Sequence, residues 1–311
     1  MDSVKKTTIT IGIPAYNEQQ NIKELLLSLF NQKLGENILK EIIVYSDVST
    51  DRTHEIVEKL GKKYPFIKLI KGRTRKGKYA LMNEMFVDCK TDVLIVMDAD
   101  IAMVGDKFIQ TLAMKLCEDK NAQMVSARNI FIRQNGFMAN LIYTYFSMWD
   151  SLLLTMPGVD AGMQFSGTVT AFRGSYARSL RIPNNVHNKH MFLYLAAKKV
   201  SGFRFCLQAE VLQLVPVTVD EVKTLLVRDI VKPDEELDKM FGKDVIAQTQ
   251  FVPRKAKLGV VLKSFVINPL YTPLALLFTF YIGRLSRKAK RSNTQLWAIN
   301  TSTKKPIALQ K

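Results

Sequence analysis

The chain has 311 residues, of which 47% are hydrophobic and 23% are charged, and its formal net charge is +17. A chain of this length and composition can bury a sizeable core, which excludes wholesale disorder. Residues 252–311 carry twelve of the basic residues and no Asp or Glu, so the rest of the chain is nearly balanced. A basic, acid-free tail favours an anionic partner, either phospholipid head groups or a nucleic acid.

The three cysteines are few and scattered, which excludes a disulfide framework and a cysteine zinc site and favours a reducing compartment. Residues 1–14 lack an apolar stretch followed by a small-residue cleavage site, so we expect no secretory signal peptide. No nucleic-acid recognition motif accompanies the basic tail, so we expect no nucleic-acid partner.

The first hundred residues alternate between strand-like and helix-like segments. Short β-branched or apolar runs predict strands over residues 7–13, 41–47, 66–72 and 92–98. Apolar residues at helical spacing predict helices over residues 22–30, 51–64 and 77–89. This alternation predicts an α/β fold with a mostly parallel, Rossmann-like sheet and helices on both faces. Ligands of such sheets bind beyond the carboxyl ends of the strands, where the polar stretches PAYNE, SDVSTD, GRTRKGK and DAD all lie.

Beyond about residue 105 the alternation blurs. The pattern there predicts a helix over 108–119, a strand over 122–132, a strand over 164–173 and a helix over 191–199. Residues 137–156 are apolar and aromatic with one charge, and residues 202–216 read as one long strand or a strand pair.

An uncharged run covers residues 264–283 and is followed at once by the basic stretch RLSRKAKR. Its 20 positions match the hydrocarbon thickness of a bilayer, and the basic flank fits the cytoplasmic side of a membrane. Pro269 and Pro273 count against one straight spanning helix. Three alternatives therefore stay open: a spanning anchor, a hairpin lying in the membrane interface, and a buried core helix.

Two carboxylates, Asp98 and Asp100, follow the fourth predicted strand. Residues i and i+2 of an extended chain face the same way, so both side chains project together. Two such carboxylates repel each other unless a cation lies between them or one is protonated. Magnesium or manganese suits this arrangement, whereas the alternative is an ordinary turn after a strand, where Asp is common.

Four motifs, in the same order along the chain, resemble glycosyltransferase family 2, the nucleotide-sugar-dependent enzymes with the GT-A fold. They are IGIPAYNE at 11–18, EIIVYSDVSTD at 41–51, RKGKYALMNE at 75–84 and VLIVMDAD at 93–100. SGTVTAFR at 166–173 extends the resemblance toward residue 210. We therefore expect four regions: a nucleotide-sugar-binding half over 1–105, an acceptor-binding half over 106–250, an apolar and basic membrane-associating segment over 251–291, and a flexible basic tail over 292–311.

The resemblance also implies roles for individual residues. It places against the nucleoside of the donor a loop that holds Pro14, Ala15, Tyr16 and Glu18. It assigns Asp47 to the base, and Asp98 with Asp100 to a Mn²⁺ or Mg²⁺ ion. Ser46 and Val48 depart from the acidic residue and the Gly that are usual there, which leaves the identity of the base open.

Lys78 corresponds to a family residue near the diphosphate of the donor. The same role follows from its position, because Lys76 and Lys78 flank Gly77 at a predicted helix N-terminus, where cations and backbone N–H groups attract phosphate. The alternative is a solvated basic loop.

The resemblance implies transfer of a sugar with inversion, in which a metal and a Lys stabilise the departing diphosphate and a base accepts the acceptor's proton. In the family an acidic pair supplies the base, but residues 181–199 contain no carboxylate. One reading makes His190, or less readily His187, the base, since imidazole titrates near neutral pH. A second needs no strong base, because the acceptor is an ionised phosphate. A third is a weak or inactive nucleotide-binding relative with a membrane-anchoring or regulatory role. Either histidine can also be an ordinary surface or capping residue.

Processive polysaccharide synthases of the family carry a Gln-x-x-Arg-Trp motif after the acceptor region. Residues 224–237 occupy that place and contain Arg228 but no Gln or Trp. The resemblance therefore favours transfer of a single sugar to a membrane-associated acceptor, such as a polyprenyl phosphate or a lipid-linked glycan. We expect this to occur on the cytoplasmic side of a membrane, with residues 264–283 as the anchor.

Overall fold

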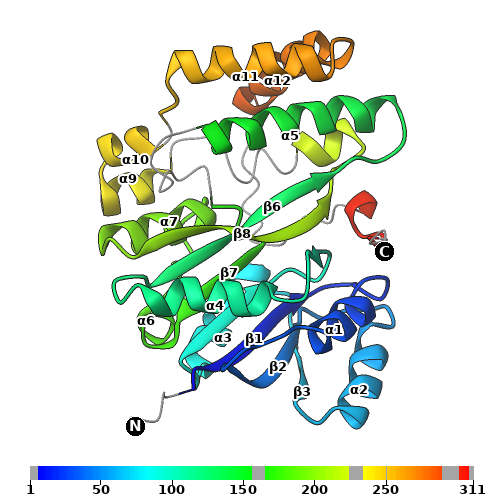
Figure 1. Cartoon of the computed structure of the whole chain (residues 1–311), viewed down its shortest axis with the longest axis vertical. Helices are drawn as coiled ribbons and strands as arrows, with labels where there is room; N and C mark the ends of the chain where they lie inside the picture. The colour runs from blue at the N-terminus through cyan, green and yellow to red at the C-terminus, as the bar shows by residue number, and fades with distance from the viewer. Residues whose placement is uncertain (1–5, 156–164, 224–233, 250, 289–300, 308–311) are drawn as a thin grey trace.

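The computed structural model describes residues 6–155, 165–223, 234–249, 251–288 and 301–307 (Figure 1). Parts of three predicted segments lie outside these residues: the stretch 224–233 with Arg228, the end of the basic flank after 288, and most of the basic tail.

Four parallel strands form one half of an eight-stranded sheet, in the spatial order β3-β2-β1-β4. They are β1 (Thr8–Ala15), β2 (Ile38–Ser46), β3 (Ile67–Lys71) and β4 (Val93–Met97). All four coincide with predicted strands, which confirms the α/β pattern. Their carboxyl ends share one edge of the sheet, so the polar loops that follow them are neighbours.

The other half of the sheet makes it mixed. Its strands are β7 (Val169–Arg173), β6 (Met124–Ile132), β8 (Phe203–Leu214) and β5 (Ala102–Met103). β7 is antiparallel to both β4 and β6, and β5 is antiparallel to β8, whereas β6 and β8 are parallel. The expectation of a mostly parallel sheet therefore holds for β1 to β4, whereas the second half of the sheet is mixed. The predicted segment 202–216 contains one long strand, β8, rather than a strand pair, with a register shift opposite Ala127 and Arg128.

Helices cover both faces of the sheet, as predicted. On one face lie α1 (Ile22–Phe30), α2 (Thr53–Lys63) and α4 (Phe108–Glu118). On the other lie α3 (Lys78–Asp88), α6 (Gly174–Ser179) and α7 (Lys189–Lys199). Alternate residues of β2 point to opposite cores, Val44 to the first and Tyr45 to the second, because successive strand side chains change face.

A third layer lies beside β6 and β8 (Figure 1). It consists of α5 (Phe137–Thr155), α11 (Arg254–Ile267) and α12 (Tyr271–Lys288), and the short helices α9 (Glu235–Phe241) and α10 (Lys243–Thr249) lie nearer α7. Both α11 and α12 pack on α5. A 3-10 turn, η2 (Thr301–Thr303), contacts β8.

The uncharged run 264–283 is a helical hairpin. Its first arm, α11, ends at Ile267, and its second arm, α12, begins at Tyr271. Pro269 lies in the connecting turn, and Pro273 lies in the first turn of α12, where the missing N–H costs no helical hydrogen bond. Over the described ranges, no helix is both long enough and apolar enough to cross a bilayer.

Candidate active site

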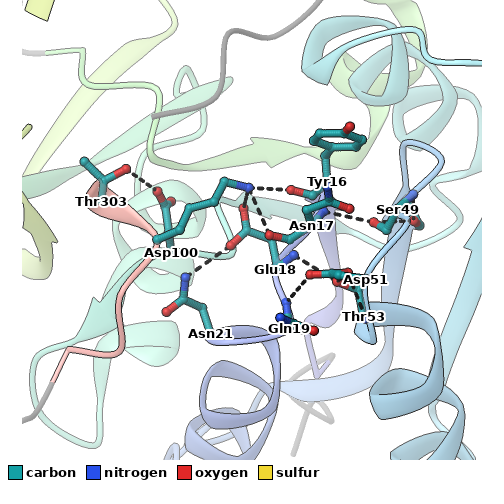
Figure 2. A network of polar contacts seen from close by, with 12 residues as sticks. Tyr16, Asn17, Glu18, Gln19, Asn21, Ser49, Asp51, Thr53, Asp100 and Thr303 are labelled. Carbon is teal, nitrogen blue, oxygen red and sulfur yellow. Dashed lines mark hydrogen bonds and ion pairs between the residues drawn. The ribbon is translucent and has the colours of Figure 1, made fainter. Parts of the chain in front are cut away.

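The loop after β1 contributes a buried carboxylate to the carboxyl edge of the sheet. Pro14 and Ala15 are themselves buried as strand residues and pair with β2. Asn17 then takes a φ of +54°, and the N–H of Glu18 donates to Thr53 Oγ1 at 2.8 Å. The side chain of Glu18 points back into the structure and accepts from Asn21 Nδ2 at 3.2 Å (Figure 2).

Asp47, at the end of β2, orders the basic loop before α3. Its two carboxylate oxygens accept from the N–H of Lys76 at 2.7 Å and from the N–H of Gly77 at 2.9 Å. The guanidinium of Arg75 lies 3.7 Å from the centroid of the Tyr16 ring, in a cation–π contact. The predicted base-binding carboxylate is therefore fully buried and engaged with this loop.

The residue after Asp47 is in a strained conformation. Val48 has a φ of +61°, in the left-handed region that a β-branched residue avoids. The Gly that is usual in the family would adopt this turn at no steric cost.

Lys78 and Asp98 meet at the centre of the edge. Lys78 Nζ lies 2.5 Å from Asp98 Oδ1 and donates to the carbonyl of Gly167 at 2.9 Å. Asp98 is buried, and its own N–H donates to the carbonyl of Thr168 at 2.9 Å. A cation at the start of α3 is thus held directly against the first of the paired acids.

Asp100 completes an acidic cluster with Asp98 and Glu18. Burial, together with the negative charges of Asp98 and Glu18, raises the pKa of Asp100 to about 7, against the opposing effect of Lys304 and Lys78. Burial also raises the pKa of Glu18, and the nearby Lys304 opposes the rise. Three carboxylates therefore share one poorly solvated place.

The donor set at this edge fits a hard divalent ion. In the part of the chain that the structure describes, no group of three or more His, Cys, Asp or Glu side chains is placed to hold a metal. Magnesium, however, is usually bound by one or two carboxylates and completes its coordination with substrate phosphates and water. Asp98 Oδ1 is buried and accepts no well-aligned hydrogen bond from the described residues, although Lys78 Nζ is close. Asp98 and Asp100 can therefore serve as such a carboxylate pair.

His190 lies at the N-terminus of α7 and packs under the loop before β7. Its Nε2 is hydrogen-bonded to the carbonyl oxygen of Phe165, and the two rings are 4.3 Å apart. Gly167 has a φ of +67°, and a Cβ there would come within 2.8 Å of the His190 ring. Gly167 therefore lies close to both residues, since its carbonyl accepts from Lys78 and its Cα faces the His190 ring.

A carboxylate does stand beside residues 187–190, and it comes from far along the chain. Asp234 Oδ2 accepts from the N–H groups of His187 at 2.7 Å and Asn188 at 2.8 Å. Its Oδ1 caps α9 by accepting from the N–H groups of Glu236 and Leu237 at 3.2 and 3.4 Å. Both oxygens are engaged, so Asp234 joins α9 to α7 and is poorly suited to act as a base. The sequence pattern that could have indicated this role is a helix N-cap, because Asp234 is followed by two Glu residues at the start of α9.

The fold and the acidic strand end are those of a GT-A-like glycosyltransferase, and comparison with known proteins agrees. The family model described as Glycosyl transferase family 2 matches residues 10–177, which is more than half of the chain. The chain therefore belongs to this family.

The fold resembles the mannosyltransferase PcManGT from Pyrobaculum calidifontis, solved with GDP-Man and Mn²⁺, at a TM-score of 0.53 and 18% identity over 93% of this chain and 77% of that one. A dolichol-phosphate mannosyltransferase from Pyrococcus furiosus is 39% identical over 93 residues, 30% of this chain and 26% of that protein. An undecaprenyl-phosphate 4-deoxy-4-formamido-L-arabinose transferase from Pseudomonas savastanoi pv. phaseolicola is 35% identical over 108 residues, 34% of this chain and 32% of that protein. The matches span about a quarter to a third of the length of these two relatives.

Proposed function

We propose that this protein transfers a sugar, with inversion, from a nucleotide-diphosphate donor to a membrane-associated acceptor in a metal-dependent reaction. The observation that carries the proposal is the position of Asp98, Asp100 and Lys78 at the carboxyl edge of the sheet in a chain of this family. The alternative is a catalytically weak nucleotide-binding relative with an anchoring or regulatory role.

The donor's diphosphate fits against the start of α3. Lys78 contacts the phosphates there, assisted by the N–H groups of the helix N-terminus. Asp98 and Asp100 would hold Mn²⁺ or Mg²⁺, and the ion would supply positive charge beside the donor's diphosphate. The loop that holds Tyr16 and Glu18 faces the nucleoside, and Asp47 acts on this region by holding the Arg75–Gly77 loop.

The surroundings of His190 favour an acceptor that is already ionised. The Nε2 atom of His190 is engaged with the carbonyl of Phe165, and Asp234 is engaged with four N–H groups. A phosphate acceptor needs neither group as a base, since its oxygens are ionised at neutral pH. Relatives named for dolichol phosphate and undecaprenyl phosphate support a polyprenyl phosphate, with a lipid-linked glycan using His190 as the alternative.

The α11–α12 hairpin supports contact with an anionic membrane, on the cytoplasmic side. We define the hairpin surface as its exposed large apolar residues: Leu258, Leu262, Phe265, Val266, Ile267, Leu270, Leu277, Phe280 and Tyr281. Exposed basic residues accompany them: Arg254, Lys255, Lys257, Lys263 and Arg284. An apolar patch with a basic flank and no acidic residue is typical of helices that lie in the membrane interface. The hairpin lies at the outer side of α5, away from β1 to β4 (Figure 1).

The test is turnover of sugar nucleotides by the full chain with Mn²⁺, compared with Asp100→Ala. We expect the variant to transfer sugar about 100-fold or more slowly, because it lacks a ligand of the metal ion that would stabilise charge on the diphosphate. Asp106→Ala is the matched control, because the Asp106 side chain is half-exposed and forms a surface ion pair with Lys33. Binding of nucleoside diphosphates without turnover of any sugar nucleotide would support the non-catalytic alternative.

A further inference from the structure

The C-terminal residues return to the donor edge and place a lysine on the β1 loop. Lys304 Nζ donates to the carbonyl oxygens of Tyr16 and Asn17 and lies 2.6 Å from Glu18 Oε1. The same ammonium lies 5.9 Å from the centroid of the Tyr16 ring. Three acceptors match the three protons of an ammonium group, so this cation is held by the loop itself.

Neighbouring residues fix the segment in this position. Ser302 donates to Glu221 through its N–H at 3.0 Å and its hydroxyl at 2.6 Å, and its carbonyl accepts from Gln134 Nε2 at 3.2 Å. Thr303 Oγ1 donates to Asp100 Oδ2 at 3.4 Å, a contact visible in Figure 2. Ser302 and Thr303 are both buried. The segment is therefore docked through side chains of β6–α5, the region after β8, and the acidic cluster.

The segment occupies groups that the donor and its metal ion are proposed to bind. Thr303 occupies an oxygen of Asp100, which belongs to the carboxylate pair proposed for the metal. Lys304 occupies the loop proposed to face the nucleoside and supplies a positive charge to the acidic cluster. A divalent cation entering beside a fixed ammonium is repelled by it, and the repulsion is strong where water is scarce.

We propose that residues 301–305 form a latch over the donor site, in which Lys304 neutralises Glu18 and Thr303 covers Asp100, and that this latch is displaced when a divalent cation and a nucleoside diphosphate bind. The inference rests on the proposed function, since it assigns a regulatory element to the same site. It predicts that the latched chain binds metal weakly and that occupancy of the site releases the C-terminal segment.

The experiment compares Mn²⁺ binding by the full-length chain, Lys304→Ala and Lys305→Ala, using the electron paramagnetic resonance signal of free Mn²⁺. Lys305 is exposed and adjacent, so its removal changes the net charge equally without touching the acidic cluster. We expect Lys304→Ala to bind Mn²⁺ about tenfold tighter and Lys305→Ala to match the unaltered chain. Lys304→Gln, which keeps most of the side-chain volume, should behave like Lys304→Ala.

A second readout follows the latch directly. Amide hydrogen exchange of residues 301–307 should quicken in Lys304→Ala, and in the unaltered chain when Mn²⁺ with UDP or GDP is added. If the unaltered chain binds Mn²⁺ and Lys304→Ala binds it equally or more weakly, the latch is overturned while the proposed function stays intact. If neither the unaltered chain nor Lys304→Ala binds Mn²⁺, the proposed metal site is overturned. Unchanged hydrogen exchange at saturating Mn²⁺ and nucleotide would overturn the latch independently.

Discussion

Shortening two apolar side chains at the tip of the hairpin tests the proposed membrane contact. The double variant Val266→Ala/Leu270→Ala removes methyl and methylene groups from two residues that are 84% and 70% exposed. Neither residue lies in the packed side of α11 and α12, which is formed by Val260, Ala275 and Phe278. The fold should therefore tolerate both changes.

The expected loss follows from the exposed fractions. At about 0.8 kcal/mol per buried carbon group, scaled by exposure, Val266→Ala loses about 1.3 kcal/mol and Leu270→Ala about 1.7 kcal/mol of membrane binding free energy. Together they amount to about 3 kcal/mol, which corresponds to roughly 100-fold weaker partitioning.

The assay is sedimentation with vesicles that contain anionic lipid, measured at low and high salt. Raising the salt should weaken binding by both proteins, since the basic flank contributes through screened charges. Val87→Ala/Val200→Ala is the control, because those residues are 58% and 53% exposed on α3 and after α7, away from the hairpin. Equal vesicle binding by the tip variant and the control would refute a hairpin-mediated contact.

Two further predictions concern the buried carboxylates. Because the pKa of Asp100 is raised to about 7 beside Asp98 and Glu18, a proton competes with the metal below that value, so Mn²⁺ affinity should rise with pH up to about 7 and then level off. A pH-independent affinity from about pH 6 to pH 8 in a calorimetric titration would contradict this. Replacing Asp234 by Ala strands four main-chain N–H groups and should lower the free energy of unfolding by about 2 to 3 kcal/mol in a denaturant titration. Glu118→Ala, at an exposed position, should change the free energy of unfolding by less than about 0.5 kcal/mol. Equal effects of the two variants would count against a stabilising role of Asp234 between α7 and α9.

The sequence was sufficient to predict β1 to β4 and the helices between them. Each of these strands is a short apolar run, and α1 and α2 have apolar residues at a clear 3.6-residue period, so local pattern and tertiary burial agree. The same regularity located the loops at one edge, which brought Glu18, Lys78, Asp98 and Asp100 together in the structure.

Features that depend on distant segments could not be predicted. The antiparallel β7 and the final strand order arise from pairings between residues far apart in the chain, which no local period encodes. Lys304 contacts a loop 286 to 288 residues earlier in the chain. Its neighbours in the sequence indicate only a basic tail and give no sign of this contact. The break between α11 and α12 was visible as Pro269 and Pro273, but an uncharged run alone does not distinguish a hairpin from one helix.

The position of the hairpin has a consequence for how the two reactants would arrive. Figure 1 shows the α11–α12 hairpin at one end of the molecule and β1 to β3 at the other, with α5, β6 and β8 between them. A chain resting on a bilayer through the hairpin would therefore present its donor half to the aqueous phase. A lipid-linked acceptor would reach the protein from the bilayer, whereas a water-soluble nucleotide sugar would approach from the aqueous side. The two reactants would then not share one route of access.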